Sequence, residues 1–359
     1  MRFAVEWIAD LDRFRAIADA WDCLAVPLGM PFVLHRWYSA WWDAFGNGRS
    51  LRVLALWDGD RLVGALPLCE GGRGELEWMA NWHTPATGPL YASQPALEQL
   101  VEEALRRGRV AVRPLPQDEP ATDALLTACD DAGALTLAED DQISPFVQIE
   151  GSWEDYRAKM KRRWSSADRK ARKMAREHDA RFTIVERPHD LDRQLRDGFE
   201  VEGSGWKGAA GTAILSQPET TAFYTAIARA FDATGELALS SIELDGRYIA
   251  FDFCLLHKGR LHLLKTGFDE SFKPLSPGLV LRYLVVERCF ELGLETHELL
   301  GSVAEWKGRF ATGERHHTEL RLLPRTPSGA LRYGYRSYAR PLLRSAYRSL
   351  PGRGTNAFA

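Results

Sequence analysis

The chain has 359 residues, of which 45% are hydrophobic and 26% are charged, and its formal net charge is −3. This length predicts two domains, and the composition is typical of a globular protein with a packed core. The small net charge gives no overall attraction to nucleic acid. The sequence also lacks an apolar run of about 18 residues that could span a membrane.

The N-terminus and the cysteines predict a cytoplasmic protein without a metal centre. The first residues include an early acid and no sustained apolar run, so they do not resemble a signal peptide. No two cysteines have CxxC spacing, which predicts reduced thiols and no zinc ligand set. The five cysteines are Cys23, Cys69, Cys129, Cys254 and Cys289.

The first half is predicted to alternate short strands and helices, beginning with a strand and a helix in the first 20 residues. Aromatic residues at helical spacing favour a helix over 32–45. Asp58-Gly59 between two apolar runs predicts a hairpin, because this pair tolerates the positive φ of a tight turn. The remaining predicted elements are a strand over 75–79, a helix over 95–106, a strand over 110–112, a helix over 121–132 and a strand over 143–149.

The second half is predicted to begin with a long charged helix over 152–177. A three-stranded meander follows, with turns at Asp245-Gly246 and at 258–259. Its strands cover 237–244, 247–257 and 260–267. The other elements are strands over 182–185, 297–300 and 319–323 and helices over 191–202, 219–231 and 277–292.

Residues 55–65 and 242–251 share one pattern of strand, Asp-Gly turn, Arg, two apolar residues and a small residue. This predicts a tandem duplication of one α/β unit, with two unrelated hairpins as the alternative. The first copy lacks the strand, loop and helix that follow the second hairpin. We therefore predict a degenerate unit over 1–150, a catalytic unit over 151–325 and a basic tail over 326–359.

A strand that ends in a loop opening onto a helix predicts a phosphate site in the second unit. Backbone N–H groups and the positive end of the helix dipole point to the same place. The alternative is a Pro-capped helix after an ordinary loop. The predicted donor-binding residues are Lys265, Thr266, Gly267, Lys273, Ser276, Gly278 and Leu279.

Several motifs of residues 30–325 resemble the CelD-type (BioF2-like) acetyltransferases of the GNAT superfamily, which are related to FemAB-type aminoacyl transferases. The resemblance implies an α/β protein with two GNAT-like units, whose mixed, mostly antiparallel sheets are flanked by helices, and with acyl-CoA bound in the second unit. The motifs are Pro31-Phe32, Leu62–Leu68, Glu202–Gly208, Phe223-Tyr224, Leu244–Phe251, Lys265–Asp269, Ser276–Gly278 and Trp306-Lys307.

The donor loop departs from the pattern of the resembled superfamily. That pattern has a basic residue or Gln, two spacers, and then Gly-x-Gly or Gly-x-Ala. Residues 272–278 keep one base, Lys273, and one glycine, Gly278. Since the FemAB relatives use aminoacyl-tRNA, two donors stay open: acetyl-CoA or another acyl-CoA, and aminoacyl-tRNA.

Acyl transfer to an amine requires an oriented donor, a group that accepts the amine proton and a charge that stabilises the carbonyl oxygen. Glu202 and Asp252 are the predicted bases, with Asp269 behind them. The alternatives are a salt bridge for Glu202 and a solvent-facing position for Asp252. Lys307 is the predicted catalytic cation, because it resembles in position a lysine that handles donor charge in FemAB-type relatives.

Aromatic residues and a second lysine are predicted to contact substrate. Trp206-Lys207 and Trp306-Lys307 both place a flat wall before an ammonium group, and Phe268 closes the strand. The alternative for each Trp-Lys pair is a surface cation–π contact.

Two basic segments could contact anionic partners. Residues 159–176 form a basic helix with one apolar face, which fits either docking between the units or contact with tRNA or another anionic surface. The tail repeats Arg every four residues from 332 to 348, and the alternatives are contact with the inner membrane surface and a solvated tail.

These patterns favour an acyl-CoA-dependent N-acyltransferase that acetylates an amino group of a sugar, a cell-envelope precursor or a small metabolite. A FemAB-like aminoacyl-tRNA-dependent transferase is the first alternative. A non-catalytic accessory protein of envelope-polysaccharide synthesis is the second.

Overall fold

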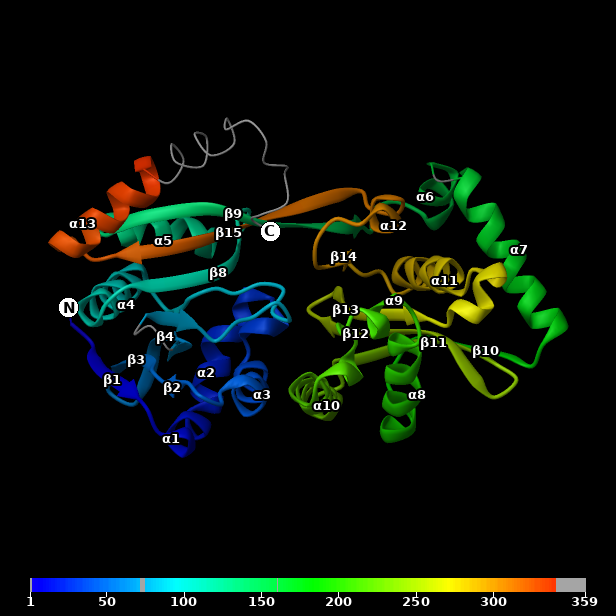
Figure 1. The fold of residues 1–359 in the computed structure, drawn as a ribbon, viewed down its shortest axis with the longest axis horizontal. Helices are drawn as coiled ribbons and strands as arrows, with labels where there is room; N and C mark the ends of the chain where they lie inside the picture. Colours follow the sequence, from blue (N-terminus) through cyan, green and yellow to red (C-terminus); the bar gives the residue numbers. More distant parts are fainter. Residues whose placement is uncertain (1, 72–74, 160, 340–359) are drawn as a thin grey trace, which may run out of the picture.

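The computed structural model describes residues 2–71, 75–159 and 161–339, and it has two lobes (Figure 1). The first lobe contains a four-stranded sheet of order β1-β3-β4-β7 and the strands at one end of a larger sheet. Its strands are β1 (Ala4–Ile8), β2 (Ser50–Leu51), β3 (Val53–Asp58), β4 (Arg61–Leu66), β5 (Leu68–Glu70), β6 (Leu76–Trp78), β7 (Leu90–Tyr91) and β8 (Val110–Pro116). Its helices are α1 (Leu11–Ala16), α2 (Ala18–Ala25), α3 (His35–Phe45), α4 (Gln94–Arg107) and α5 (Pro120–Asp131).

The second lobe places a twisted antiparallel meander between helices. Its strands are β10 (Ala180–Glu186), β11 (Leu237–Leu244), β12 (Arg247–His257), β13 (Arg260–Phe268) and β14 (Thr296–Glu298). Its helices are α6 (Trp153–Lys159), α7 (Lys161–Glu177), α8 (Leu191–Gly203), α9 (Trp206–Ala209), α10 (Pro218–Ala233), α11 (Pro277–Glu291) and α12 (Glu305–Gly308). The predicted α/β class, with mixed, mostly antiparallel sheets flanked by helices, is confirmed.

Two long strands, β9 (Leu135–Gln148) and β15 (Gly313–Leu323), join the lobes into one eleven-stranded sheet (Figure 1). β15 pairs with β9 along its length and also with β8, while β14 pairs with the end of β9. The predicted strands at 143–149 and 319–323 were therefore too short. The missed part of β9 contains the exposed acidic run Glu139–Asp141, which hides the alternation of a half-buried strand.

The predicted repeat has a structural counterpart in two hairpins. β3–β4 and β11–β12 each carry a register shift just before the turn. The unpaired residue is Val63 in the first hairpin and Ile249 in the second, which are matched positions of the sequence repeat. The boundary at residue 150 stays a prediction, because β15 returns from the second unit to pair with β8 of the first.

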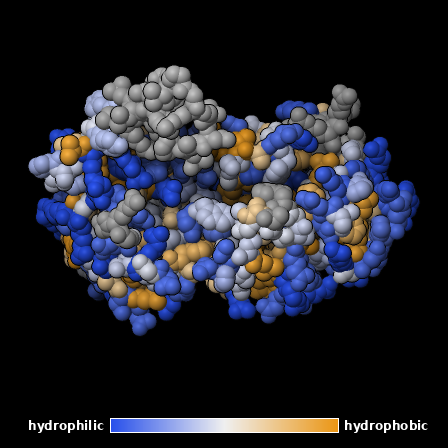
Figure 2. Space-filling model, viewed as in Figure 1, coloured by the Kyte–Doolittle hydropathy of each residue, from blue (hydrophilic) through white to orange (hydrophobic). Residues whose placement is uncertain are grey.

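The second lobe is layered, and each face of its sheet has its own hydrophobic core. α8 and α10 cover one face and share a core with the first lobe, where α10 packs on α3. α11 and α7 cover the other face (Figure 1). The surface is largely hydrophilic, and its outline is indented between the lobes (Figure 2).

The predicted helix over 152–177 is described as α6 and α7, on either side of residue 160, which lies outside the described residues. None of the described helices is both long and apolar enough to cross a membrane. The tail begins with α13 (Pro327–Gly334) and a π-helical turn at Tyr335–Ala339. The rest of the predicted basic tail, from residue 340 onward, lies outside the described part of the chain.

Candidate active site

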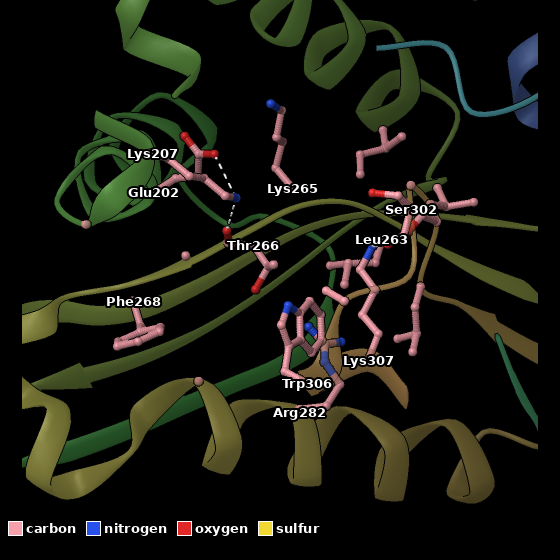
Figure 3. A pocket seen from close by; sticks show the side chains of 18 of the residues that line it. Glu202, Lys207, Leu263, Lys265, Thr266, Phe268, Arg282, Ser302, Trp306 and Lys307 are labelled. Carbon is pink, nitrogen blue, oxygen red and sulfur yellow. Dashed lines mark hydrogen bonds and ion pairs between the residues drawn. The ribbon is translucent and has the colours of Figure 1, made fainter. Parts of the chain in front are cut away.

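The second unit contains a cavity of about 690 Å³ where two parallel strands part. β13 and β14 pair only through Arg260–His262 and Thr296–Glu298. Beyond this point Leu263–Phe268 lines one side of the cavity and Leu299–Ser302 lines the other (Figure 3). The facing edges of the two strands thus border an open space instead of each other.

The N-terminus of α11 closes one end of this cavity. Ser276 precedes the helix in the left-handed region, at φ 51°, and no side chain caps the helix. A Cβ on Gly278 would lie 3.1 Å from Cδ1 of Phe268, so glycine allows the helix to approach β13 closely. All seven predicted donor-binding residues line the cavity, although Lys273 is exposed at its edge.

A β-bulge in β13 sets the face of the sheet to which each cavity-lining residue of this strand points. Phe253 lies opposite Lys265, but the next residue, Cys254, lies opposite Leu263, so Leu264 is the extra residue. As a result Lys265 points toward the α8 and α10 face, whereas Thr266 points toward the α11 face (Figure 3).

Glu202 and Lys207 form a buried pair on the α8 face. Lys207 Nζ lies 3.1 Å from Glu202 Oε1 and donates to the carbonyl oxygen of Thr266 at 2.6 Å. The N–H of Ile214 donates to Glu202 Oε2 at 2.9 Å. The side chain of Glu202 is fully buried, and both residues line the cavity. The predicted base therefore lies in the cavity, and the predicted salt-bridge alternative is present as well.

Asp252 does not reach the cavity, which argues against its predicted role as base. Its carboxylate forms a buried ion pair with Arg282 at 2.7 Å, and Arg282 also donates to Nε2 of His297 at 2.7 Å. The side chains of Asp252 and Arg282 are 0% and 2% exposed. Burial raises the pKa of Asp252, and the charge of Arg282 opposes this shift. The solvent-facing alternative for Asp252 is wrong, because its side chain is fully buried, and its partner on α11 could not be read from the sequence.

Asp269 also has a structural role that differs from its predicted one. It accepts hydrogen bonds from the N–H and hydroxyl of Ser271, at 2.9 and 2.7 Å, and so caps the short turn that follows β13. It also pairs with Arg247. Asp269 is not among the residues that line the cavity.

Lys307 lies in the cavity next to Trp306. Its ammonium donates to the carbonyl oxygens of Leu300 and Ser302 and lies 5.7 Å from the Trp306 ring centroid. Burial, with the nearby charges of Arg282 and Lys207, lowers the pKa of Lys307 to about 8. Phe268 and Trp306 line the cavity as predicted, whereas the side chain of Trp206 lies outside the described part of the structure.

Sequence reasoning missed the residues that the first lobe contributes, and it did not assign a role to Tyr224. Trp82–Pro85 and Gln142 line the cavity from a loop and from β9. Nδ1 of His83 lies 3.2 Å from the hydroxyl of Tyr224, on α10. Burial raises the pKa of Tyr224 well above its ordinary value and lowers that of His83 to about 3. A Trp-His-Thr-Pro run in an irregular segment was the available signal.

Along the part of α7 whose side chains are described, much of the basic charge is paired on the helix itself. Arg172 contacts Asp168 at 2.7 Å, and Lys173 and Arg176 both contact Glu177. Lys170 instead donates to the hydroxyl of Ser276, so α7 reaches the donor loop. Among the described residues no cluster of three or more His, Cys, Asp or Glu side chains could hold a metal ion.

Comparison with known proteins finds a family model that matches part of the second lobe. Residues 160–308 match the family model described as an acetyltransferase (GNAT) domain, a range that includes β13, β14 and α11 but not the first-lobe residues that line the cavity. No protein with a curated description matches the chain. The finer CelD-type assignment stays a prediction.

Solved structures extend the similarity of fold to both lobes. FemX superposes with a TM-score of 0.58 at 11% identity, over 91% of this chain and 100% of that one. The C-terminal domain of a protein provisionally assigned as a lysylphosphatidylglycerol synthetase, from Agrobacterium fabrum, gives 0.53 at 12%, over 95% and 100%. L-PGS from Bacillus licheniformis gives 0.52 at 10%, over 91% and 96%. At these identities the likeness concerns the fold alone.

Proposed function

We propose that the protein is an N-acyltransferase that moves an acyl group, most simply acetyl, from acyl-CoA to an amine. The observation that carries this proposal is the parting of β13 and β14 into a cavity that ends at the N-terminus of α11. An extended thioester arm can bind between two free strand edges through backbone hydrogen bonds. Its phosphates would then meet the N–H groups of α11 and the ammonium of Lys273.

The two faces of β13 give the donor and the acceptor separate places. The α11 face, with Thr266, Phe268 and Trp306, would hold the CoA arm. The opposite face, with Glu202, Tyr224 and Lys265, would hold the amine. The acyl group would lie at the gap between the strands, where both faces meet.

In the proposed reaction the amine nitrogen attacks the thioester carbonyl. The new C–N bond forms, the C–S bond breaks, the amine loses a proton and the departing thiolate gains one. Glu202 keeps unused lone pairs that could accept the amine proton, and the protonated phenol of Tyr224 could supply one to sulfur. The ammonium of Lys307 would stabilise the carbonyl oxygen as it gains charge.

Direct measurement of donor binding tests this proposal. Isothermal titration with acetyl-CoA should give a saturable heat, and Lys273→Ala should weaken binding by about tenfold, because a hydrogen bond to a charged group is worth about 1.5 kcal/mol at the lower end of its range and Lys273 is exposed. An exposed lysine far from the cavity, Lys258, provides the matched control variant Lys258→Ala. Absence of binding at near-millimolar acetyl-CoA would refute the acyl-CoA assignment.

A second candidate donor is aminoacyl-tRNA, as in the FemAB-type transferases. The observation that favours it is the contact of Lys170 on α7 with Ser276, because this links the basic helix to the donor loop. RNA that co-purifies with the protein, and binding that weakens steeply with salt, would support this donor. The acceptor class, an accessory role in envelope synthesis and contact of the tail with a membrane surface stay proposals.

A further inference from the structure

Lys265 is a buried cation without an acidic partner. It is 7% exposed, and its ammonium lies 4.7 Å from the ring centroid of Trp82 and 5.2 Å from that of Tyr224. Among the described residues, none forms a hydrogen bond or an ion pair with this ammonium. Aromatic faces attract an ammonium group but leave its charge uncompensated.

The acids near Lys265 are already engaged. Glu202 accepts from Lys207 and from the N–H of Ile214, and it acts on Lys265 only through its field. Asp252 is paired with Arg282 on the other face. Glu270, the other acid that lines the cavity, is exposed and forms no ion pair with Lys265. The ammonium of Lys265 therefore has no ion-pair partner among the described side chains.

An unbalanced ammonium in this position is costly, and an anion would remove the cost. Burial lowers the pKa of Lys265 to about 8, while Glu202 raises it and Lys207 lowers it. The group is thus still mostly charged at neutral pH, despite the penalty of burial. A ligand anion beside it would raise that pKa again, and the gain would appear as binding affinity.

The same charge is poorly suited to a purely cationic ligand. A protonated amine near Lys265 would be repelled, and the repulsion favours the neutral, nucleophilic form of an amine nearby. Trp82, which is 68% exposed, lies against His83 with ring centroids 3.6 Å apart and forms a flat wall on this side. A ligand that pairs with Lys265 would therefore lie along an aromatic surface.

We propose that the acceptor is an amine that also carries a carboxylate or phosphate group, and that Lys265, beside Trp82, binds this anionic group. That this ligand is an acyl acceptor rests on the proposed acyltransferase function. The anion site itself rests only on the position and surroundings of Lys265.

Paired acceptors test the proposal. Release of free CoA thiol is measured with glucosamine 6-phosphate against glucosamine, and with glycine against glycinamide, for the wild type and Lys265→Met. The loss of kcat/KM in the variant should be larger, by about tenfold or more, for the anionic member of each pair than for the neutral member, since a charge-assisted hydrogen bond is lost only with the anionic member. Intrinsic reactivity of each amine cancels in the ratio between variant and wild type. Lys258→Met, on the exposed turn before β13, is the control.

A binding measurement keeps the two proposals separable. Phosphate and acetate are titrated in a thermal-shift assay, with and without saturating CoA, and the wild type should be stabilised more than Lys265→Met. Equal responses of the two proteins, or equal losses for neutral and anionic acceptors, would overturn the anion site. Turnover of acetyl-CoA without any such preference would leave the acyltransferase proposal standing. Anion binding that depends on Lys265, without acetyl-CoA binding, would support the anion site and refute the acyl-CoA assignment.

Discussion

Replacing Asp252 by Asn should destabilise the fold without changing the chemistry of transfer. Asp252 and Arg282 are 2.7 Å apart and almost fully buried, between β12 and α11. Removing one member of such a pair leaves an uncompensated buried charge, which costs about 3–5 kcal/mol. At about 2.1 cal/mol/K of unfolding entropy per residue, the chain has roughly 0.75 kcal/mol/K, so the melting temperature should fall by about 4–7 °C.

The assay is equilibrium urea unfolding followed by circular dichroism, together with a thermal melt. The surface pair of Asp43 and Arg15, 2.9 Å apart but about half exposed, provides the control variant Asp43→Asn, which should cost less than about 1 kcal/mol. The double variant Asp252→Asn with Arg282→Met should recover much of the loss, because it removes both charges. Transfer by folded Asp252→Asn should keep the shape of its pH profile.

The reasoning fails if Asp252→Asn unfolds at the wild-type urea concentration yet loses transfer. Asp252 would then be a chemical base, as its sequence context first indicated, and the ion pair with Arg282 would be incidental to stability. Loss of stability in both the single and the double variants would instead show that packing, not charge, explains the cost.

Three further changes test the site. Gly267→Ala would place a Cβ 2.4 Å from the Cα of Glu202, so we expect about 1–3 kcal/mol of destabilisation and weaker transfer, whereas Gly334→Ala, with open space around it, should cost little in urea unfolding. Lys265→Met should be more stable than the wild type at pH 7. Burial lowers the pKa of Lys265 to about 8 in the folded wild type, so the unfolded chain binds more protons than the folded one between about pH 8 and 10.5. Unfolding measured as a function of pH should therefore show that the wild type gains stability over this range and that the variant does not. Lys307→Met should lower kcat about 10²-fold, with a smaller effect on the KM for acyl-CoA. The wild-type kcat should fall above about pH 8, where Lys307 loses its charge. An unchanged kcat in the variant would exclude the proposed role.

Local patterns were enough to predict the elements that hold the donor side of the site. The meander from 237 to 268 has clear turn residues, and the next helix begins at a proline, so their predicted bounds differ from the structure by a residue or so. Apart from Lys265, which faces the acceptor side, the predicted donor-binding residues are close in sequence and belong to one strand, loop and helix. They therefore come together whenever that local unit forms.

The acceptor side could not be predicted in the same way, because it depends on contacts between residues far apart in the chain. Trp82 and His83 lie in an irregular loop, and only the packing of α10 on α3 brings them to Tyr224. The bulge at Leu264 decides that Lys265 faces this side, and the consecutive Leu263-Leu264 that interrupts the alternation does not by itself identify a bulge. The sequence left open whether Asp252 lies in a cleft or faces solvent, because whether such an acid is a base or half of a buried ion pair depends on a residue 30 positions away.

The first unit, although it lacks a donor loop of its own, supplies what the second unit cannot. One edge of β14 pairs with β13, over three residues only, and the other edge pairs with β9 of the connecting segment. If that pairing were absent, β14 would be a three-residue strand with little to hold it away from β13, and the gap between the strands depends on that separation. The first unit also provides the Trp82–Pro85 wall beside Lys265. The first lobe therefore has a physical role at the site: β9 holds the strand that opens the cavity, and the Trp82–Pro85 loop forms one side of the space in which the proposed acceptor would bind.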